Sequence, residues 1–243
     1  MRPLEIRAFD MAAGERFAPH AHDWAQFTYS SQGVLTVVTG EGRFLAPPAM
    51  AVWLPPGLEH RIETVGPAKF RSLYIAADRI GGMPVQCTVL SVDPLLRHLI
   101  LEAAALPRDW DEAGAPGRLM TVILDRIRAA APAQLHLPLP GDPRLKAATD
   151  ILLADPADRR GLEEIARETG ATSRTLARLF QRETGMTFGT WRRRRTLLAA
   201  LERLSEGDPV TTVALDLGYE SPSAFIAMFR RTLGDTPTRY LQR

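Results

Sequence analysis

The last third of the chain, residues 162–243, contains an internal repeat, and this repeat restricts the possible fold more than any other feature. The first half of each copy aligns at an offset of 48 residues, which places Gly218 opposite Gly170. One added residue then changes the offset to 49, which places Phe229 opposite Phe180. A solenoid needs at least about three repeats. Two copies therefore predict two small related modules.

The first copy predicts two helices joined by a short turn. Apolar and small residues recur at helical spacing from Leu162 to Thr169, and Gly170 suits the left-handed position that ends a helix. Thr172 is the expected N-cap of the next helix, because its hydroxyl can accept a hydrogen bond from a free backbone N–H. The buried face of that helix is expected to contain Leu176, Leu179 and Phe180.

The second copy shows the same order of signals. Gly218 ends one helix, and Ser221 followed by Pro222 begins another. A short helix, a glycine-containing turn and a second helix form the helix-turn-helix signature. Two helical hairpins that only pack together are the alternative. Two copies joined by a long predicted helix over residues 188–205 favour the helix-turn-helix interpretation.

At these residues the chain resembles the AraC/XylS family of transcription regulators. The matching segments are LEEIARETGATSRTLARLFQRETGMTFGTWRRRR and VTTVALDLGYESPSAFIAMFRRTLGDTP. The second is the more specific, because the family signature spans its Gly-Tyr, Ser, Phe, Phe-Arg and Gly-x-x-Pro positions. The resemblance covers residues 143–243. It implies a regulator, not an enzyme, that binds double-stranded promoter or operator DNA.

The resemblance also implies which side chains contact DNA. In the first recognition helix, the family's base contacts correspond to Arg174, Thr175, Ala177 and Arg178. Arg174 is the first candidate, because a guanidinium can donate two hydrogen bonds to guanine. The second recognition helix presents mostly small residues, so we expect it to hold the DNA backbone. Its expected contacts are Ser221, Ser223, Ala224, Ala227, Arg230 and Arg231.

The distribution of charge agrees with DNA contact by the C-terminal part. The whole chain has a net charge of only +2. From residue 143 onward there are 17 Lys and Arg residues against 13 Asp and Glu residues, whereas the preceding part has 13 against 15. A basic part of the chain fits contact with phosphate. The run Arg192–Arg195 has three candidate roles: a solvated helix face, contacts to phosphate, or ion pairs within the domain.

The first 90 residues predict a β-rich domain. Short apolar or alternating segments are separated by Gly or Pro turns, a pattern typical of an antiparallel barrel or sandwich. The expected strands span residues 26–30, 33–39, 42–45, 51–54, 60–64 and 70–75. Two amphipathic helices are expected at 94–105 and 118–131, then an extended linker over 135–143 and a helix at 144–154.

The expected fold class is therefore α+β: an N-terminal cupin-like β-barrel with flanking helices, then an all-α domain of two helix-turn-helix modules joined by a long helix. The predicted domains are an effector-sensing barrel (1–92), a helical dimerisation or packing segment (93–134), a linker (135–142) and the DNA-binding domain (143–243). The helical segment is expected to form a homodimer, because its apolar faces need covering. Packing on the barrel is the alternative.

Two motifs in the barrel resemble those of the cupin family. The pattern G-x5-H-x-H-x3-Q-x6-G, which begins at Gly14, has the spacing of the first cupin motif, with Gln26 where that family usually has Glu. The pattern P-x-G-x2-H, which ends at His60, resembles the second motif without its leading Gly and trailing Asn. Alternation along a strand predicts that His20 and His22 point to the same face.

These residues have two candidate roles. The preferred one is a pocket for a small organic effector, as in many regulators of the resembling family, lined by His20, His22, Gln26 and His60 with aromatic residues such as Trp24, Tyr29 or Trp53. The other is a divalent metal ion held by the three imidazoles, with Gln26 as a weaker oxygen ligand. The missing carboxylate lowers the charge available for a cation. The aromatic residues can equally belong to the barrel core.

Two further functions stay open at this point. The N-terminal domain can serve dimerisation alone, or the chain can be a metal-dependent cupin enzyme. The weak fourth ligand and the presence of two helix-turn-helix modules argue against the enzyme. A response of DNA affinity to a small molecule would separate an effector-responsive regulator from the other two.

The remaining features predict a cytoplasmic protein. Cys87 is the only cysteine, which excludes an internal disulfide and fits a reducing compartment. The start of the chain has no apolar core of signal-peptide length. The most apolar stretch, residues 44–54, is interrupted by Pro47 and Pro48, so no membrane segment is expected.

Overall fold

The computed structural model of the protein describes residues 4–64, 66–107, 109–133 and 135–241. These residues form two compact units. The first contains residues 4–39 and 44–133, and the second contains residues 40–43 and 135–241. Each unit buries its own apolar side chains.

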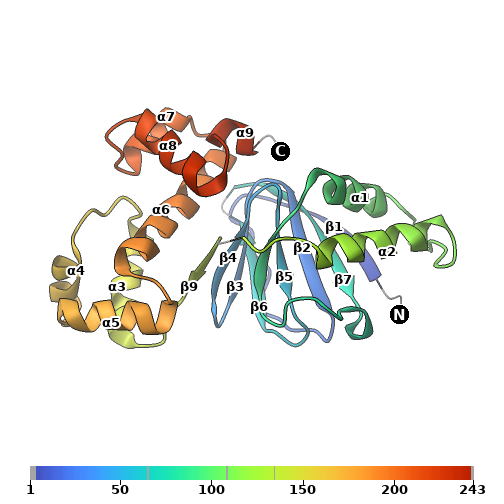
Figure 1. Ribbon diagram of the computed structural model, residues 1–243, viewed down its shortest axis with the longest axis horizontal. Helices are drawn as coiled ribbons and strands as arrows, with labels where there is room; N and C mark the ends of the chain where they lie inside the picture. The colour runs from blue at the N-terminus through green and yellow to red at the C-terminus, as the bar shows by residue number, and fades with distance from the viewer. Residues whose placement is uncertain (1–3, 65, 108, 134, 242–243) are drawn as a thin grey trace. The chain divides into compact units, whose positions relative to one another are not determined.

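The first unit is built on antiparallel strands, drawn in blue to green in Figure 1. One sheet has the strand order β1-β7-β2-β5-β8, and the other has the order β6-β3-β4-β9. The strands are β1 (Leu4–Met11), β2 (Ala25–Gln32), β3 (Leu35–Thr39), β4 (Gly42–Ala46), β5 (Met50–Leu54), β6 (His60–Thr64), β7 (Ala68–Ile75), β8 (Thr88–Ser91) and β9 (His136–Pro138). The last of these, β9, belongs to the second unit, as do the first residues of β4.

One face of the five-stranded sheet packs against two helices, which lie along it in Figure 1. They are α1 (Pro94–Ala104) and α2 (Ala115–Arg128), and a short 3-10 turn, Ala77–Arg79, precedes them. The first helix begins at Asp93, whose carboxylate accepts a 2.8 Å hydrogen bond from the backbone N–H of Leu96. Side chains at alternating strand positions fill the shared core, among them Phe27, Tyr29 and Trp53.

The other face of the same sheet carries buried polar side chains. Gln26 and Thr28 alternate with Phe27 along β2, and Ser72 lies opposite Thr28 on β7. All three polar side chains are at most 1% exposed and are hydrogen-bonded to one another. Because buried polar groups are costly unless paired, this row is a specific feature of the interior and not a solvated surface.

The β-domain differs from prediction in two added strands, in the bounds of its second helix, and by one or two residues at several strand ends. The strand over 60–64 is confirmed, but β1 and β8 were not among the predicted strands. Charged residues interrupt the apolar alternation of β1, and its eight backbone pairs with β7 hold it in the sheet nonetheless. The second helix spans Ala115–Arg128 and not 118–131, because Pro116 in its first turn already fits a helix start.

The predicted linker contains a short strand. Strand β9 pairs with the start of β4, and the backbone N–H of Leu139 donates to the carbonyl of Glu41. The two strands approach so closely that a Cβ on Gly42 would lie 2.7 Å from the carbonyl oxygen of Leu137. This stretch forms a strand because it pairs with a segment about a hundred residues away. A local sequence pattern cannot indicate such a partner.

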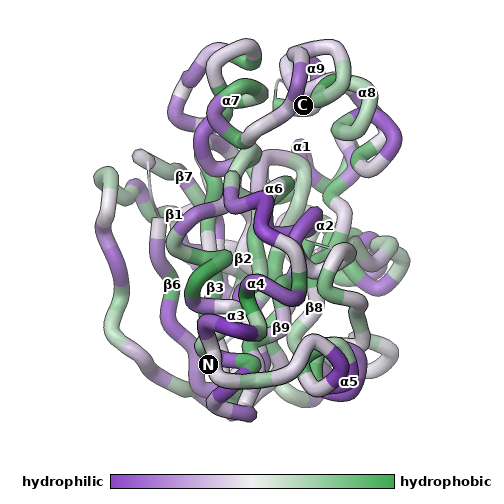
Figure 2. Tube along the Cα trace, turned by 90° about the vertical axis from the view of Figure 1, so that its left-hand side faces the viewer, coloured by the Kyte–Doolittle hydropathy of each residue, from purple (hydrophilic) through white to green (hydrophobic). Residues whose placement is uncertain are grey.

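The second unit is helical. Its helices are α3 (Pro143–Ala154), α4 (Leu162–Glu168), α5 (Ser173–Thr184), α6 (Phe188–Ser205), α7 (Val210–Asp216), α8 (Pro222–Leu233) and α9 (Pro237–Leu241). The long helix α6 has the predicted bounds and connects the α4–α5 module to the α7–α8 module (Figure 1). Figure 2 shows hydrophilic stretches along α5 and α6.

The repeat in the sequence is a repeat in backbone conformation. Gly170 and Gly218 both have positive φ, at 66° and 81°, as the end of each first helix requires. In each turn the following backbone N–H, that of Ala171 or Tyr219, donates a 2.9 Å hydrogen bond back into the preceding helix. The second turn has one more residue before its N-cap, which explains the change of offset from 48 to 49.

The helices that follow the two turns are capped and packed in the same way. Thr172 and Ser221 are the N-caps of α5 and α8, as predicted, and each accepts a 3.2 Å hydrogen bond from the backbone N–H three residues later. Equivalent aromatic pairs then fill the two cores. The ring centroids lie 6.0 Å apart in Phe180–Trp191 and 5.6 Å apart in Phe229–Tyr240.

Candidate functional site

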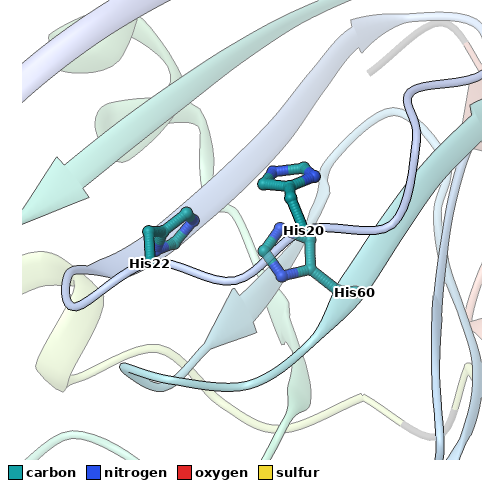
Figure 3. Close-up of side chains that lie close together, drawn as sticks. All are labelled: His20, His22 and His60. Atoms are coloured by element: carbon teal, nitrogen blue, oxygen red, sulfur yellow. The ribbon is translucent and has the colours of Figure 1, made fainter.

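Three histidines of the first unit converge at one point (Figure 3). His60 is the first residue of β6, and His20 lies opposite it in an isolated antiparallel bridge. One ring nitrogen from each of His20, His22 and His60 lies within 4.8 Å of the others. His60 is buried, His22 is half-buried and His20 is exposed, so the cluster is open to solvent at one side.

The prediction that His20 and His22 share the face of one strand is wrong. His20 lies in an isolated bridge to His60, and His22 lies in an irregular segment just before the bend that leads into β2. The carbonyl of His22 accepts a 2.8 Å hydrogen bond from the N–H of Gly57, in the turn that precedes β6. The two histidines therefore meet because both backbone positions are tied to the segment that carries His60.

Each ring is fixed through its Nδ1 atom. The Nδ1 atoms of His20, His22 and His60 each lie 2.9 Å from a backbone carbonyl oxygen two residues away. A carbonyl can only accept, so each Nδ1 carries the hydrogen and each Nε2 of a neutral ring has a free lone pair. Histidines that bind metal ions are oriented by a hydrogen bond of this kind from the other ring nitrogen.

The Nε2 atom of His60 is buried and has no hydrogen-bond partner among the described residues. Burial, with smaller contributions from the neighbouring His20 and His22, lowers the pKa of His60 to about 4, and the hydrogen bond to the carbonyl of Leu58 opposes this change. The ring is therefore neutral at pH 7, with its lone pair directed into the cluster. A buried lone pair without a donor costs free energy, and a bound cation removes that cost. The residues present fit a divalent metal ion.

Gln26 lies beside the cluster. Its Oε1 atom is 2.9 Å from Nε2 of His22, and its Nε2 atom donates to the hydroxyls of Thr28 and Ser72 at 2.8 and 2.9 Å. With the hydrogen of His22 on Nδ1, the first contact joins two acceptors. The contact places the amide oxygen close enough to the imidazoles to be a further ligand of the same cation.

The sequence did not indicate Thr28 and Ser72, which hold the Gln26 amide. The signal for Thr28 was its spacing of two from Gln26 on one strand, which places both on the same face. No sequence signal pointed to Ser72, because β7 and β2 meet only through sheet pairing. Tyr74 was also missed. Its ring lies 5.7 Å from that of His22.

Two of the three aromatic residues predicted for the pocket belong to the core instead. Tyr29 and Trp53 are fully buried on the face that packs against α1 and α2. The Tyr29 hydroxyl accepts a hydrogen bond from Arg97, and the Trp53 indole N–H donates to the carbonyl of Pro84. Tyr29 is three residues from Gln26, and an odd separation along a strand places two side chains on opposite faces. Trp24 is half-buried and its carbonyl oxygen holds His22.

The first recognition helix, α5, presents a basic face. Leu176, Leu179 and Phe180 are buried, as predicted. Arg174, Ala177 and Arg178 are exposed. Thr175 is half-buried, and its hydroxyl is hydrogen-bonded to that of Thr172 at the N-cap. Arg174 and Arg178 therefore are the side chains of this face with free hydrogen-bond donors.

The second recognition helix, α8, presents a different face. Its exposed residues include Ser223, Ala224, Ala227, Arg230 and Arg231. Ser221 is half-buried, and its hydroxyl accepts the N-cap hydrogen bond from Ala224. The small residues offer little hydrogen bonding, and the two arginines follow them toward the end of the helix.

The arginine run at the start of α6 binds mostly within its own unit. Arg192, Arg194 and Arg195 donate to the backbone carbonyls of Arg160, His136 and Leu153, respectively. Desolvation by burial lowers the pKa of Arg194 and Arg195. Arg193 is exposed and donates to the hydroxyl of Thr190. Arg195 also lies 3.9 Å from a carboxylate oxygen of Glu202, which is the ion pair within the domain that was one of the three expected roles. The contacts to backbone carbonyls were not predicted.

Comparisons with known proteins also divide the chain into two units with different functions. Residues 2–138 match the family model of the AraC-like ligand binding domain, and residues 165–243 match that of a helix-turn-helix domain. The HTH-type transcriptional regulator NimR of Escherichia coli K12 is 34% identical over 224 residues, 92% of this chain and 82% of the relative. The regulatory protein SoxS of Escherichia coli K12 is 37% identical over 83 residues, 34% of this chain and 78% of the relative.

Among solved structures, that of wild-type ToxT from Vibrio cholerae with a bound unsaturated fatty acid aligns with 98% of this chain and 94% of its own. The sequence identity is 11% and the TM-score is 0.41, which is too remote to inform the site. In the described part of this chain, no helix combines the length and the apolarity needed to cross a bilayer.

Proposed function

The chain belongs to the AraC family of transcription regulators, and on this basis we propose how its two units work. It is a helix-turn-helix DNA-binding regulator with an N-terminal ligand-binding domain, as the sequence predicted. Its relatives are named transcriptional regulators, in agreement with the prediction that the chain is not an enzyme.

We propose that the histidine cluster is the site where the regulator receives its signal, and that it binds a divalent transition-metal ion. The observation that carries this proposal is the convergence of His20, His22 and His60, with every Nδ1 held by a carbonyl and the Nε2 of His60 buried without a partner. Imidazole nitrogens suit zinc, iron, nickel and copper. The Gln26 amide oxygen is the candidate for a fourth ligand.

When bound, the ion would supply positive charge and open coordination positions to which an oxygen or nitrogen atom of a small-molecule effector can bind. The chain's own residues orient the site. The carbonyls of Ala18, Trp24 and Leu58 fix the three rings, and Thr28 and Ser72 fix Gln26. Exposed His20 marks the side from which ligands enter. A ligand there regulates the protein if it binds the DNA-binding conformation with a different affinity.

For the second unit we propose that α5 reads bases and α8 holds the backbone of promoter DNA. The exposed Arg174 and Arg178 have free donors for guanine, whereas α8 offers Ser223, small residues and the pair Arg230–Arg231. Two such modules reach successive major grooves when they lie about 34 Å apart along one face of the DNA. Because its target is promoter DNA, we place the protein in the cytoplasm.

We also propose that the protein is a homodimer that associates through α1 and α2. Leu95 and Val122 are exposed apolar residues on these helices, 53% and 44% accessible. Burial of such residues against a second copy removes apolar surface from water. Sedimentation of the purified protein gives the oligomeric state, and Leu95→Asp is expected to shift it toward the monomer.

The metal proposal is tested by titrating metal-stripped and cobalt-loaded protein against its own upstream promoter DNA at fixed salt. We expect cobalt to bind with an absorption spectrum that reports nitrogen ligands, and to change the affinity for DNA. His20→Ala and His60→Ala are expected to abolish both effects. His98→Ala is the matched control, because His98 is an exposed histidine of α1 and is not part of the cluster.

The outcomes separate the alternatives. Cobalt binding that survives His60→Ala would contradict the site. If metal does not change the DNA affinity but an organic compound does, the pocket is a metal-free effector site. DNA affinity that responds to neither would leave dimerisation as the function of the first unit.

A further inference from the structure

The second unit has a small groove beside the second helix-turn-helix module. Its volume is about 290 Å³. It is lined by the α3–α4 loop (156–159), by Arg192 and Thr196 of α6, and by the turn of the second module (217–220) with Ala224 of α8. The groove therefore involves the α3–α4 loop, the connecting helix α6 and the second module, next to the start of the second recognition helix.

Arg159 enters this groove across Gly218. A Cβ on Gly218 would lie 2.7 Å from Nε of Arg159 and 3.0 Å from its Nη2 atom, so the guanidinium packs directly on the glycine backbone. At the equivalent Gly170 of the first module, a Cβ would meet nothing within 4 Å. Both glycines have positive φ, but only the second also makes room for an arginine. The groove is thus specific to the second module.

Three arginines bring positive charge near Tyr219. Arg159 of the α3–α4 loop lines the groove, whereas Arg193 of α6 and Arg231 of α8 lie outside its lining. Burial raises the pKa of Tyr219, and the charges of the three guanidiniums oppose that rise. The ring itself is held by an edge-to-face contact with Phe225, 5.2 Å between centroids.

None of these three arginines forms an ion pair among the described residues, although acids are close by. Asp158 is paired with Arg160, which also binds Glu168. Glu220 is exposed at the rim of the groove. Arg192, which also lines the groove, donates to the carbonyl of Arg160 and lies over the ring of Phe188. The groove thus presents the guanidinium of Arg159, which has no ion pair among the described residues, beside the ring of Tyr219.

We propose that this groove binds a phosphate of the DNA backbone, beside the major groove that α8 enters. Guanidinium groups and a phenol hydroxyl are donors that match phosphate oxygens. The location next to the start of the second recognition helix favours a backbone phosphate over a free anion. This proposal rests on the DNA-binding function of the unit. It adds Arg159 and Tyr219 to the expected DNA contacts.

The first test is the salt dependence of DNA binding. Loss of one phosphate contact lowers the slope of log affinity against log salt by about 1, and it weakens specific and non-specific DNA alike. We expect this result for Arg159→Gln. Tyr219→Phe keeps the ring contact with Phe225 and removes only the hydroxyl, with an expected loss of about fivefold in affinity. Arg239→Gln is the matched control, an exposed arginine of α9 outside the groove lining.

The second test locates the phosphate. Single neutral methylphosphonates are placed in turn along the footprinted operator, and each DNA is titrated with wild-type protein and with Arg159→Gln. We expect one position where neutralisation weakens the wild type but has no further effect on the variant. Arg239→Gln should retain the full sensitivity at that position. Circular dichroism of each variant establishes that the helices are intact.

Two results would overturn the proposal without touching the DNA-binding function. In one, Arg159→Gln and Tyr219→Phe bind operator DNA as the wild type does, with the same salt slope. In the other, inorganic phosphate binds to the wild type and not to Arg159→Gln, while their DNA affinities are equal. Wild-type protein that binds no DNA specifically would instead contradict the proposed role of the whole unit.

Discussion

The backbones of His20 and His60 exchange two hydrogen bonds, of 3.0 and 2.9 Å, and their rings lie 4.5 Å apart. The pair joins two segments separated by forty residues, and no regular strand surrounds His20. Reciprocal bonds of this kind fix the two Cα atoms close together. The site therefore has its geometry before any ligand binds, which lowers the entropic cost of binding.

The stability of the metal-free protein should depend on pH through His60. Its pKa is about 4 in the folded protein, below the value of 6.5 for an unperturbed histidine. The unfolded chain then takes up the proton first as the pH falls. Stability is complete above pH 6.5 and is lost between pH 6.5 and 4, by up to about 3 kcal/mol.

Urea unfolding of metal-free wild type and of His60→Gln at pH 7 and pH 5 measures this effect. Other titrating groups contribute to both proteins, so the difference between the two pH dependences isolates His60. A variant with the same loss of stability between the two pH values as the wild type would contradict the assignment.

The amide of Gln26 limits the affinity of the cluster for cations. Gln26→Glu has the same shape and adds a negative charge at 2.9 Å from His22, while Thr28 and Ser72 can donate to it. We expect an increase of about tenfold in cobalt affinity, a typical size for changes around metal ligands. Gln32→Glu adds the same charge to an exposed position of the same strand and should change little. Equal effects of both substitutions would indicate only a general electrostatic contribution.

Base specificity should reside in the first module. Arg174→Ala is expected to relax the preference at one base pair by about 1–3 kcal/mol, because a guanidinium that binds guanine is lost. Ser223→Ala is expected to leave the preferred sequence unchanged. Binding to a library of operator variants measures both. The assignment fails if Arg174→Ala retains the affinity and base preference while Ser223→Ala destroys them.

The two N-caps should contribute equally to stability. Thr172→Ala and Ser221→Ala each remove an acceptor for a backbone N–H and should each lower the free energy of unfolding by about 1 kcal/mol. Ser223→Ala is the control, because Ser223 is exposed and does not cap α8. Thermal or urea unfolding of the intact chain provides the comparison. A loss in Ser223→Ala as large as that in Ser221→Ala would show that the cap is not the cause.

Coupling between the metal site and DNA binding can be measured with one change in each unit. Gln26→Glu alters a group in the first unit, and Arg174→Ala alters one in the second. Distant substitutions usually have additive effects unless the sites are coupled. A double variant whose DNA affinity departs from additivity in the presence of cobalt would therefore measure the coupling that regulation requires.

The sequence by itself determined the features that depend on neighbours within a few residues. Helix ends at Gly170 and Gly218, N-caps at Thr172 and Ser221, and the full extent of α6 follow from local hydrogen bonds and from apolar spacing. The repeat strengthened these predictions, because the same signals occurred twice. The three histidines were also identified from their spacing, together with the glutamine beside them.

Only the tertiary structure decided which of these side chains meet and what holds them. The pairing of β2 with β7 brought Ser72 to Gln26, placed Tyr29 on the opposite face from that glutamine, and gave β1 its place in the sheet. The folding of the second unit brought Arg159 onto Gly218. The physical reason is that sheet pairing and packing between helices join segments far apart in the chain, and their register depends on the whole fold and not on local propensity.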